Sequence, residues 1–364
     1  MKGMVFDMKN IFGMDAFKGW NIRIPLIQGG MGVGVSLGGL AGAVAAEGGI
    51  GVISTAQIGF EEPDFVGNEL ECNLRGIHKQ IAKAKEIAGG NGMVGVNVMV
   101  ALQQYRDHVV EAVKAGADAI ICGAGLPMDL PALVEEGAAK IAPIVSSRKA
   151  AALIMRSWDK KYHRAPDFIV AEGPKAGGHL GFSKEQLDNE PQSYFEEELR
   201  GIIEEKQSYE EKYGRRIPVF AAGGVWDSTD AKYFADLGVD GIQAATRFVA
   251  TKECDASMEY KMAYVNAKEE DVSIIKSPVG MPGRAIHNKF IRETEAQPQK
   301  ISRCYRCIKS CKPAEIPYCI TQALVTAVHG DVENGLVFCG SNVGKITEIT
   351  TVHDVVEDLM YLPE

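Results

Sequence analysis

The sequence has no surplus of basic residues and no long hydrophobic run. Its 39 Lys and Arg are outnumbered by 48 Asp and Glu, which gives a net charge of −9 and a pI near 5.4. Because no positive charge is left to neutralise phosphates, we expect neither nucleic acid nor an anionic membrane as a partner. The smoothest apolar stretch, Leu37–Ser54, is broken by Glu47, so no membrane span is expected. The first residues, MKGMVFDMKN, lack the apolar core of a signal peptide, and we expect a cytoplasmic protein.

A complete GxGxxG fingerprint is also missing after the first apolar run, which disfavours a doubly wound dinucleotide-binding sheet. The chain instead repeats one unit, in which a short apolar run is followed by small residues and then by a helical pattern. The runs are predicted as buried parallel strands over Pro25–Gly30, Gly49–Ser54, Met93–Val100, Ala119–Gly125, Ile141–Ser147, Asp167–Gly173, Pro218–Gly224 and Gly241–Phe248. Helices are predicted between them, among others over Leu37–Glu47, Gly76–Ala88, Tyr105–Ala115 and Ser228–Leu237.

Eight alternating strand–helix units predict an α/β fold of the (β/α)8 TIM-barrel type. Helix-capping glycines support these boundaries, because Gly48, Gly116 and Gly238 each stand just before a predicted strand. A plain barrel takes about 250 residues, so this chain of 364 has residues to spare. We expect the barrel to comprise 1–251 and 331–364, and 252–330 to form a small cap inserted after the eighth strand. A solvated charged helix over Asn189–Arg216 and a closing helix over Val352–Met360 complete the prediction.

The most informative segment is 167–181, DFIVAEGPKAGGHLG, in which an apolar strand runs into a glycine-rich turn. Glycines let backbone amides approach a flat or anionic ligand, because no Cβ stands in the way. His179 is the side chain of this turn that can move a proton near neutral pH, and it is predicted to be catalytic. The alternative is a loop histidine that satisfies a structural hydrogen bond.

Other turns at strand ends carry further candidates. The run Gln28-Gly29-Gly30-Met31 offers backbone that can lie against a planar ring. Asn97 is an amide inside the third strand, where it either contacts a ligand or makes a structural hydrogen bond. After the last two strands, Gly223–Gly224 and Ala245–Thr246 stand where barrels bind phosphate. Together these turns predict a grip on the phosphate of a cofactor.

The ordered stretches PLIQGGMG, GVNVM, AEGPKAGGHLG, PVFAAGGV, GVDGIQAATRFVAT and NGLVFCGSN resemble the nitronate monooxygenase (2-nitropropane dioxygenase) family, which is related to flavin-dependent enoyl-acyl-carrier-protein reductases. The resemblance covers nearly the whole chain and implies an FMN-binding barrel. It implies that Gln28, Gly29, Gly30 and Met31 line the flavin, with Asn97 at its ring, Gly178 nearby and His179 as the catalytic residue. It also implies that the phosphate lies on Gly223, Gly224, Gln243, Ala244, Ala245 and Thr246. Two departures are Ala245, where the family has Gly, and Phe182–Tyr194, which lacks the family's usual glutamine and glycine pattern.

Three functions are open at this point. The first is oxidation of small-molecule alkyl nitronates at the flavin, with His179 as base or as the group that orients the nitro group. The second is NAD(P)H-dependent reduction of an enoyl thioester, with His179 protonating or positioning the product. The third is a non-catalytic flavin-binding barrel, which the intact histidine turn disfavours. The oligomeric state stays open, with a homodimer as one form compatible with the sequence.

The cap contains a feature that the family resemblance does not explain, the spacing C-x2-C-x3-C-x7-C formed by Cys304, Cys307, Cys311 and Cys319. Three thiolates within eight residues can surround one corner of a cubane and a fourth can complete it, so a [4Fe–4S] cluster is predicted. Zinc is the second candidate, although zinc sites more often use two C-x2-C pairs. The third is four ordinary thiols, since a reducing cytoplasm disfavours disulfides. The other cysteines, Cys72, Cys122, Cys254 and Cys339, are predicted to be packing residues.

Overall fold

The computed structural model describes residues 11–189 and 191–363. The N-terminal segment MKGMVFDMKN, which is predicted not to be a signal peptide, lies outside the described residues. Within the described part of the chain, none of the helices combines the length and the apolar character needed to cross a bilayer.

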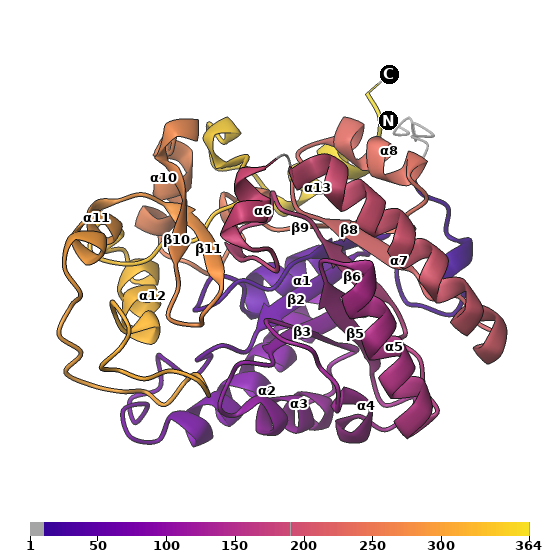
Figure 1. The fold of residues 1–364 in the computed structure, drawn as a ribbon, viewed down its shortest axis with the longest axis horizontal. Helices are drawn as coiled ribbons and strands as arrows, with labels where there is room; N and C mark the ends of the chain where they lie inside the picture. The colour runs from indigo at the N-terminus through magenta and orange to yellow at the C-terminus, as the bar shows by residue number, and fades with distance from the viewer. Residues whose placement is uncertain (1–10, 190, 364) are drawn as a thin grey trace.

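Eight parallel strands close into a barrel in the order β1-β2-β3-β4-β5-β6-β8-β9, which confirms the TIM-barrel prediction (Figure 1). Every predicted strand is present, and its observed bounds differ from the predicted ones by one to a few residues. Their bounds are β1 Leu26–Gln28, β2 Ile50–Ser54, β3 Met93–Met99, β4 Ala119–Gly123, β5 Lys140–Val145, β6 Ile169–Glu172, β8 Val219–Ala222 and β9 Gly241–Ala244.

The strands form because their residues are almost wholly apolar and can be buried on both faces of a parallel sheet. At the N-terminal end of the barrel the interior is closed by aromatic rings. Phe168 and Phe220 have ring centroids 5.7 Å apart, and Phe17, from the short helix η1 (Asp15–Phe17), lies 5.5 Å from Phe220. With this end filled, the opposite end, where the strands terminate, is left for a ligand.

Helices cover the outside of the barrel (Figure 1). Their bounds are α1 Gly38–Ala46, α2 Glu69–Ala88, α3 Tyr105–Lys114, α4 Leu130–Leu133, α5 Arg148–Tyr162, α6 Lys184–Asp188, α7 Pro191–Tyr213, α8 Ser228–Asp236, α9 Thr246–Val249 and α13 Val352–Met360. The predicted caps are confirmed, because Gly48, Gly116 and Gly238 have φ angles of +89°, +83° and +97°. Helix α2 begins before the predicted Gly76, since Cys72 and Asn73 are buried on its first turn.

The segment between β9 and α13 folds beside the mouth of the barrel, in orange and yellow in Figure 1. Its elements are α10 Met258–Asn266, η2 Glu269–Asp271, β10 Val272–Lys276, β11 Pro282–Ile286, α11 Lys289–Ala296, α12 Ile320–Val328 and η3 Val343–Lys345. Strands β10 and β11 form an antiparallel sheet whose third strand is β7, Gly178–His179, from the turn after β6. The turn predicted as a loop is therefore an edge strand that joins the cap to the barrel by backbone hydrogen bonds.

Candidate active site

A pocket lies at the C-terminal ends of the barrel strands, between the strands and the cap. Its lining contains every residue that sequence analysis assigned to the flavin or to catalysis except Gln28, namely Gly29, Gly30, Met31, Asn97, Gly178, His179, Gly223, Gly224, Gln243, Ala244, Ala245 and Thr246. The return segment Phe338–Asn342, between the cap and the last helix, also lines it. The (β/α)8 fold thus brings together turns that are far apart in the sequence, at the edge where such barrels carry their active sites.

Gln28 differs from the prediction, because its side chain is used inside the barrel. Its Oε1 accepts a hydrogen bond from Val52 N at 3.1 Å, and its Nε2 donates to Gly29 O at 2.5 Å. Gln28 is completely buried and does not line the pocket. Side chains alternate along a strand. The turn that follows Gln28 therefore lines the pocket, while Gln28 itself links β1 to β2 by hydrogen bonds.

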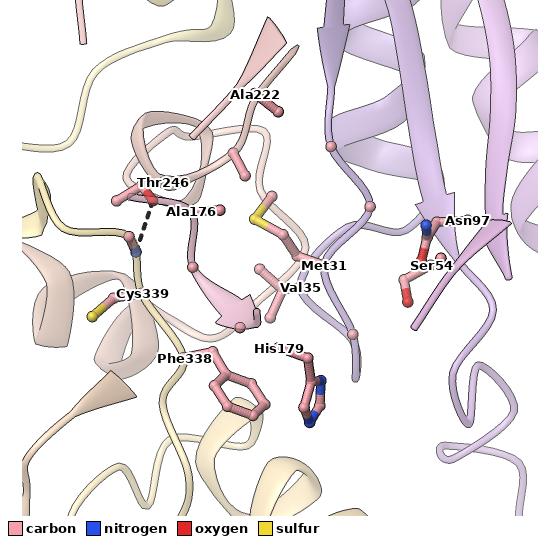
Figure 2. A pocket seen from close by; sticks show the side chains of 18 of the residues that line it. Met31, Val35, Ser54, Asn97, Ala176, His179, Ala222, Thr246, Phe338 and Cys339 are labelled. Carbon is pink, nitrogen blue, oxygen red and sulfur yellow. Dashed lines mark hydrogen bonds between the residues drawn. The ribbon is translucent and has the colours of Figure 1, made fainter. Parts of the chain in front are cut away.

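Asn97 occupies one side of the pocket, next to Ser54 on the neighbouring strand, as Figure 2 shows. Its Nδ2 donates only a long hydrogen bond, 3.4 Å, to Ile121 O, so the amide has capacity left for a ligand. The turn at Gly30 passes directly over it, and a Cβ at Gly30 would stand 2.5 Å from Asn97 Cβ. Glycine at this position therefore keeps the amide and the turn in contact.

On the opposite side, Gly223 and Gly224 form a cradle of backbone with Thr246 and the return segment. Both glycines have left-handed φ angles, +89° and +94°, and a Cβ on Gly223 would lie 2.8 Å from Gly173 O. Thr246 Oγ1 accepts a hydrogen bond from Gly340 N at 3.0 Å, drawn in Figure 2. The hydroxyl of Ser341 is buried and has no hydrogen-bond partner in the described chain. A buried polar atom without a partner fits a site whose ligand supplies the missing acceptor.

Lys175 adds positive charge to this cradle and was not singled out from the sequence. It lines the pocket, and its aliphatic stem crosses Gly224 so closely that a Cβ there would lie 2.9 Å from Lys175 Cδ. Arg247 also lines the pocket, but its Nη2 is paired with Asp358 at 2.7 Å. Lys175 forms no ion pair with any described residue, so it is the cation available for a phosphate.

His179 lies where the cap meets the barrel. Its Nε2 is 2.7 Å from Ser277 Oγ, and its ring meets the ring of Phe338 edge to face with centroids 5.0 Å apart. Burial lowers the pKa of His179 to about 4, so the imidazole is neutral at neutral pH. Ser277 Oγ accepts a hydrogen bond from Val279 N at 3.3 Å, and its own proton can be donated to His179 Nε2. When Ser277 donates in this way, the imidazole proton is on Nδ1.

Glu172, the last residue of β6, is a second titratable group in the pocket that was not singled out from the sequence. Burial raises its pKa to about 8, so the carboxyl group carries its proton at neutral pH. The sequence does contain a feature that could have identified Glu172, since it is a carboxylate at the end of an otherwise apolar strand. The interior of the pocket is therefore uncharged at both His179 and Glu172 before a ligand binds.

The four cysteines of the cap are near one another but are not arranged around a single ion. Burial raises the pKa of Cys311, and the neighbouring thiols of Cys304 and Cys319 raise it further. Burial also raises the pKa of Cys307 to about 11, with Cys319 and Cys311 adding to the effect. In the described residues, which include all four cysteines, no group of three or more His, Cys, Asp or Glu is placed to hold one metal ion.

The remaining cysteines are buried, in agreement with the packing role predicted for them. Cys339 has an additional position, because it lines the pocket beside Phe338. Cys254 Sγ lies 3.4 Å from Val35 O, as expected for a small, weakly polar core residue.

The low pKa of His179 predicts acid destabilisation with a defined sign. Folding favours the neutral imidazole, so the stabilisation is complete above pH 6.5 and is lost as the pH falls toward 4. Between pH 6.5 and 4 His179 should therefore lower the free energy of unfolding by up to about 3 kcal/mol, while Glu172, whose pKa is raised, acts in the opposite direction. The contribution of His179 is therefore the difference between wild type and a variant that lacks the imidazole. Urea unfolding at a series of pH values measures it.

His179→Gln, which cannot titrate, should show a shallower loss of stability between pH 6.5 and 4. His353→Gln, which replaces an exposed histidine beside Glu47, serves as the control and should keep the wild-type slope apart from a small change. If the unfolding free energy depended on pH equally in wild type and His179→Gln, the pKa of His179 would be the same in the folded and unfolded protein, and the prediction would be wrong.

Comparison with known sequences decides the family. The sequence model described as "Nitronate monooxygenase" matches residues 16–361. The chain belongs to the nitronate monooxygenase family. A probable nitronate monooxygenase of Staphylococcus aureus (strain JH9) is 26% identical over 295 residues, which cover 75% of this chain and 78% of the relative. The corresponding Staphylococcus saprophyticus protein is 25% identical over 298 residues, with the same shares.

Solved structures with the same fold agree with this comparison. FabK from Thermotoga maritima superposes with a TM-score of 0.70 at 25% identity, covering 95% of this chain and 93% of that one. The nitroalkane oxidase from Streptomyces ansochromogenes has a TM-score of 0.67 at 19% identity, with 93% and 95% covered, and supports the fold. This member of the nitronate monooxygenase family is a flavin-dependent oxidoreductase. The family assignment therefore favours an enzyme over the non-catalytic flavin-binding barrel.

Proposed function

We propose that this protein binds FMN in the pocket at the barrel mouth and oxidises alkyl nitronates at the flavin, with His179 as the catalytic residue. The observation that carries the proposal is the position of a neutral, half-buried histidine in the same pocket as a cradle suited to phosphate. Both features come from turns at strand ends, which supports a shared function for them.

The residues of the pocket fit FMN. Gly223 and Gly224 offer backbone without Cβ atoms, Thr246 begins α9, and the unpartnered Ser341 hydroxyl can donate to a phosphate oxygen. Lys175 would balance the phosphate charge. On the other side, Gly29, Gly30, Met31 and Asn97 would contact the ring system. When bound, FMN supplies the capacity to accept electrons from the substrate.

A neutral His179 suits a nitronate substrate in particular. A nitronate is already the deprotonated form of a nitroalkane, so the enzyme needs no base to remove a carbon-bound proton. His179 can instead donate its Nδ1 proton to an oxygen of the nitro group and orient the substrate against the ring. Phe338, packed against the imidazole, keeps water away from this hydrogen bond.

A second candidate is NAD(P)H-dependent reduction of an enoyl thioester, as in the related enoyl-acyl-carrier-protein reductases. The likeness to FabK over 95% of the chain favours it. Apolar side chains contributed by the cap and by the loop after β3, Leu102, Ile320 and Leu324, also line the pocket and could accommodate an acyl chain. His179 would then position the thioester or protonate the product.

One pair of assays separates the two candidates. Oxygen consumption with propyl-2-nitronate, in the absence of nicotinamide, is the result expected for nitronate oxidation. Oxidation of NADH or NADPH that depends on a short enoyl thioester would instead establish the reductase. Protein that takes up FMN but turns over in neither assay would overturn both.

Ser277 is a positioning residue in this proposal, because it holds His179 Nε2 without lining the pocket itself. Ser277→Ala should reduce kcat by about tenfold, because the imidazole loses the partner that fixes its tautomer and orientation. Its flavin content should not change. Ser277→Thr, which keeps the hydroxyl, should recover most of the rate, and a kcat that is low in both variants would point to a packing defect instead.

A further inference from the structure

The proposed reaction does not use the cysteines at positions 304, 307, 311 and 319. We propose that they bind an iron–sulfur cluster, most simply one [4Fe–4S], in the cap at the edge of the flavin pocket. The spacing suggested such a site, and the structure adds four independent features: the gathering of the thiols, the charge around them, the backbone amides that face them, and the position of Cys307.

The thiols gather although the segment that carries them has no helix or strand from the end of α11 at Ala296 to the start of α12 at Ile320. Cys307 lines the flavin pocket together with Thr321, which lies two residues after Cys319 at the start of α12, so distant parts of the cysteine run meet at one place. In a single tetrahedral zinc site the sulfurs stand roughly 3.8 Å apart, because each Zn–S bond is about 2.3 Å. In a cubane each thiolate binds a different iron, so the sulfurs are farther apart. Among the described residues no group of three or more such ligands converges on one ion, so a preformed zinc site is disfavoured and the wider spacing of a cubane is the geometry that we propose.

The charge of the segment is opposite to that of the chain. The whole protein has a net charge of −9, yet residues 300–312, KISRCYRCIKSCK, contain five basic residues and no acidic one. These are Lys300, Arg303, Arg306, Lys309 and Lys312. A cubane with four thiolate ligands is an anion, and so many cations next to one another are stabilised by an anion among them.

Backbone amides also face the sulfurs. Arg306 has a left-handed φ of +49°, and its N–H donates to Cys304 Sγ at 3.4 Å. Cys319 is the N-cap residue of α12, a helix of nine residues, so it stands at the end of the helix where free N–H groups and the positive end of the dipole meet. Amide donors of this kind stabilise thiolate ligands of iron–sulfur clusters.

The segment has few anchors for its length. Most of its side chains are exposed, and it is held by two buried side chains, Ile308 and Tyr318, by Tyr305 stacked on Phe65, and by backbone contacts to the loop after β3. Gln103 N donates to Cys307 O at 2.9 Å, Lys309 N donates to Ala101 O at 3.0 Å, and Leu102 pairs with Ile308. Ordering a loop of this length without a core is costly in entropy, and metal–thiolate bonds would offset that cost.

The position of the site connects it to the flavin pocket. Cys307 and Ile308 line the pocket, and so does Thr321 in the first turn of α12, two residues after Cys319. A cluster held by these cysteines would therefore stand against the flavin site and not on a remote surface. The proposal does not depend on the substrate, because it concerns only what the four thiols bind.

Metal analysis of the full-length protein tests the proposal. The protein should be prepared without oxygen, reconstituted with ferrous iron and sulfide, and freed of unbound metal. We expect about four irons and four sulfides per chain and a visible absorption, apart from that of the flavin, that bleaches with dithionite. Cys304→Ser and Cys311→Ser should each lose most of the iron, and their thermal midpoints should fall.

Cys254→Ser is the matched control, because Cys254 is a buried free thiol outside the cap cluster and serine can keep its hydrogen bond to Val35 O. It should retain iron, sulfide and flavin as in wild type. One zinc per chain in place of iron would overturn the proposal. So would four thiols that react with an alkylating reagent in protein without metal after reconstitution, or full iron content in both Cys304→Ser and Cys311→Ser.

Discussion

His179→Ala is expected to lose at least about a hundredfold in kcat while keeping its flavin, since general acid–base or hydrogen-bond assistance from one group contributes about 10²–10⁴ in rate. The histidine contacts Ser277 and Phe338, on the cap side of the pocket. The phosphate cradle at Gly223, Gly224 and Thr246 is formed by other segments. Steady-state kinetics with nitronate, together with the ratio of flavin to protein, measure both parts of the prediction.

The matched control is His353→Ala, which removes an exposed imidazole on α13 far from the pocket lining. It should turn over like wild type. If His179→Ala also did so, the imidazole would be a structural residue that satisfies Ser277. Loss of flavin from His179→Ala would place the histidine in cofactor binding instead of catalysis.

Gly223→Ala is expected to weaken flavin binding by at least about a hundredfold, an effect of roughly 3 kcal/mol in binding free energy. Gly223 has a φ of +89°, and the new Cβ would lie 2.8 Å from Gly173 O and 2.9 Å from Ala176 N. Because both contacts are backbone atoms, one side of the cradle must move. A moved cradle no longer presents its amides to the phosphate. Fluorescence titration of flavin-depleted protein with FMN measures the dissociation constant.

Gly238→Ala controls for the strain of a left-handed alanine. Gly238 has a φ of +97°, but the nearest atom to its new Cβ is Ile203 Cδ1 at 3.9 Å, and the position is outside the pocket lining. This variant should lose about 1 kcal/mol of stability and bind FMN normally. If both variants lost flavin equally, the effect at Gly223 would come from general destabilisation, and the assignment of the cradle would be wrong.

The barrel could be predicted from the sequence because its signals are local. Each strand is an apolar run that ends in small residues, and each capping glycine lies next to the helix that it ends, as at Gly48 and Gly116. The pocket followed from the barrel, since the ends of parallel strands meet at one edge. That is why the sequence alone predicts one site for turns as distant as Gly30 and Thr246.

What could not be predicted depends on contacts between distant segments. Strand β7 has two residues, too few for a pattern, and exists because β11 pairs with it about a hundred residues later along the chain. For the same reason Ser277 gave no signal as the partner of His179. Gln28 was assigned to the flavin because it adjoins the glycine turn, whereas the alternation of side chains along β1 directs it to Val52.

A crystal structure of the flavin-loaded protein is the most direct test of the central claim, that one pocket at the barrel mouth holds FMN against His179. We predict the phosphate within hydrogen-bond distance of the Gly224 amide, Thr246 Oγ1 and Ser341 Oγ. We also predict the ring system between Asn97 and His179, with His179 Nε2 still bonded to Ser277. A flavin bound elsewhere, or a phosphate that leaves Ser341 without a partner, would contradict the account.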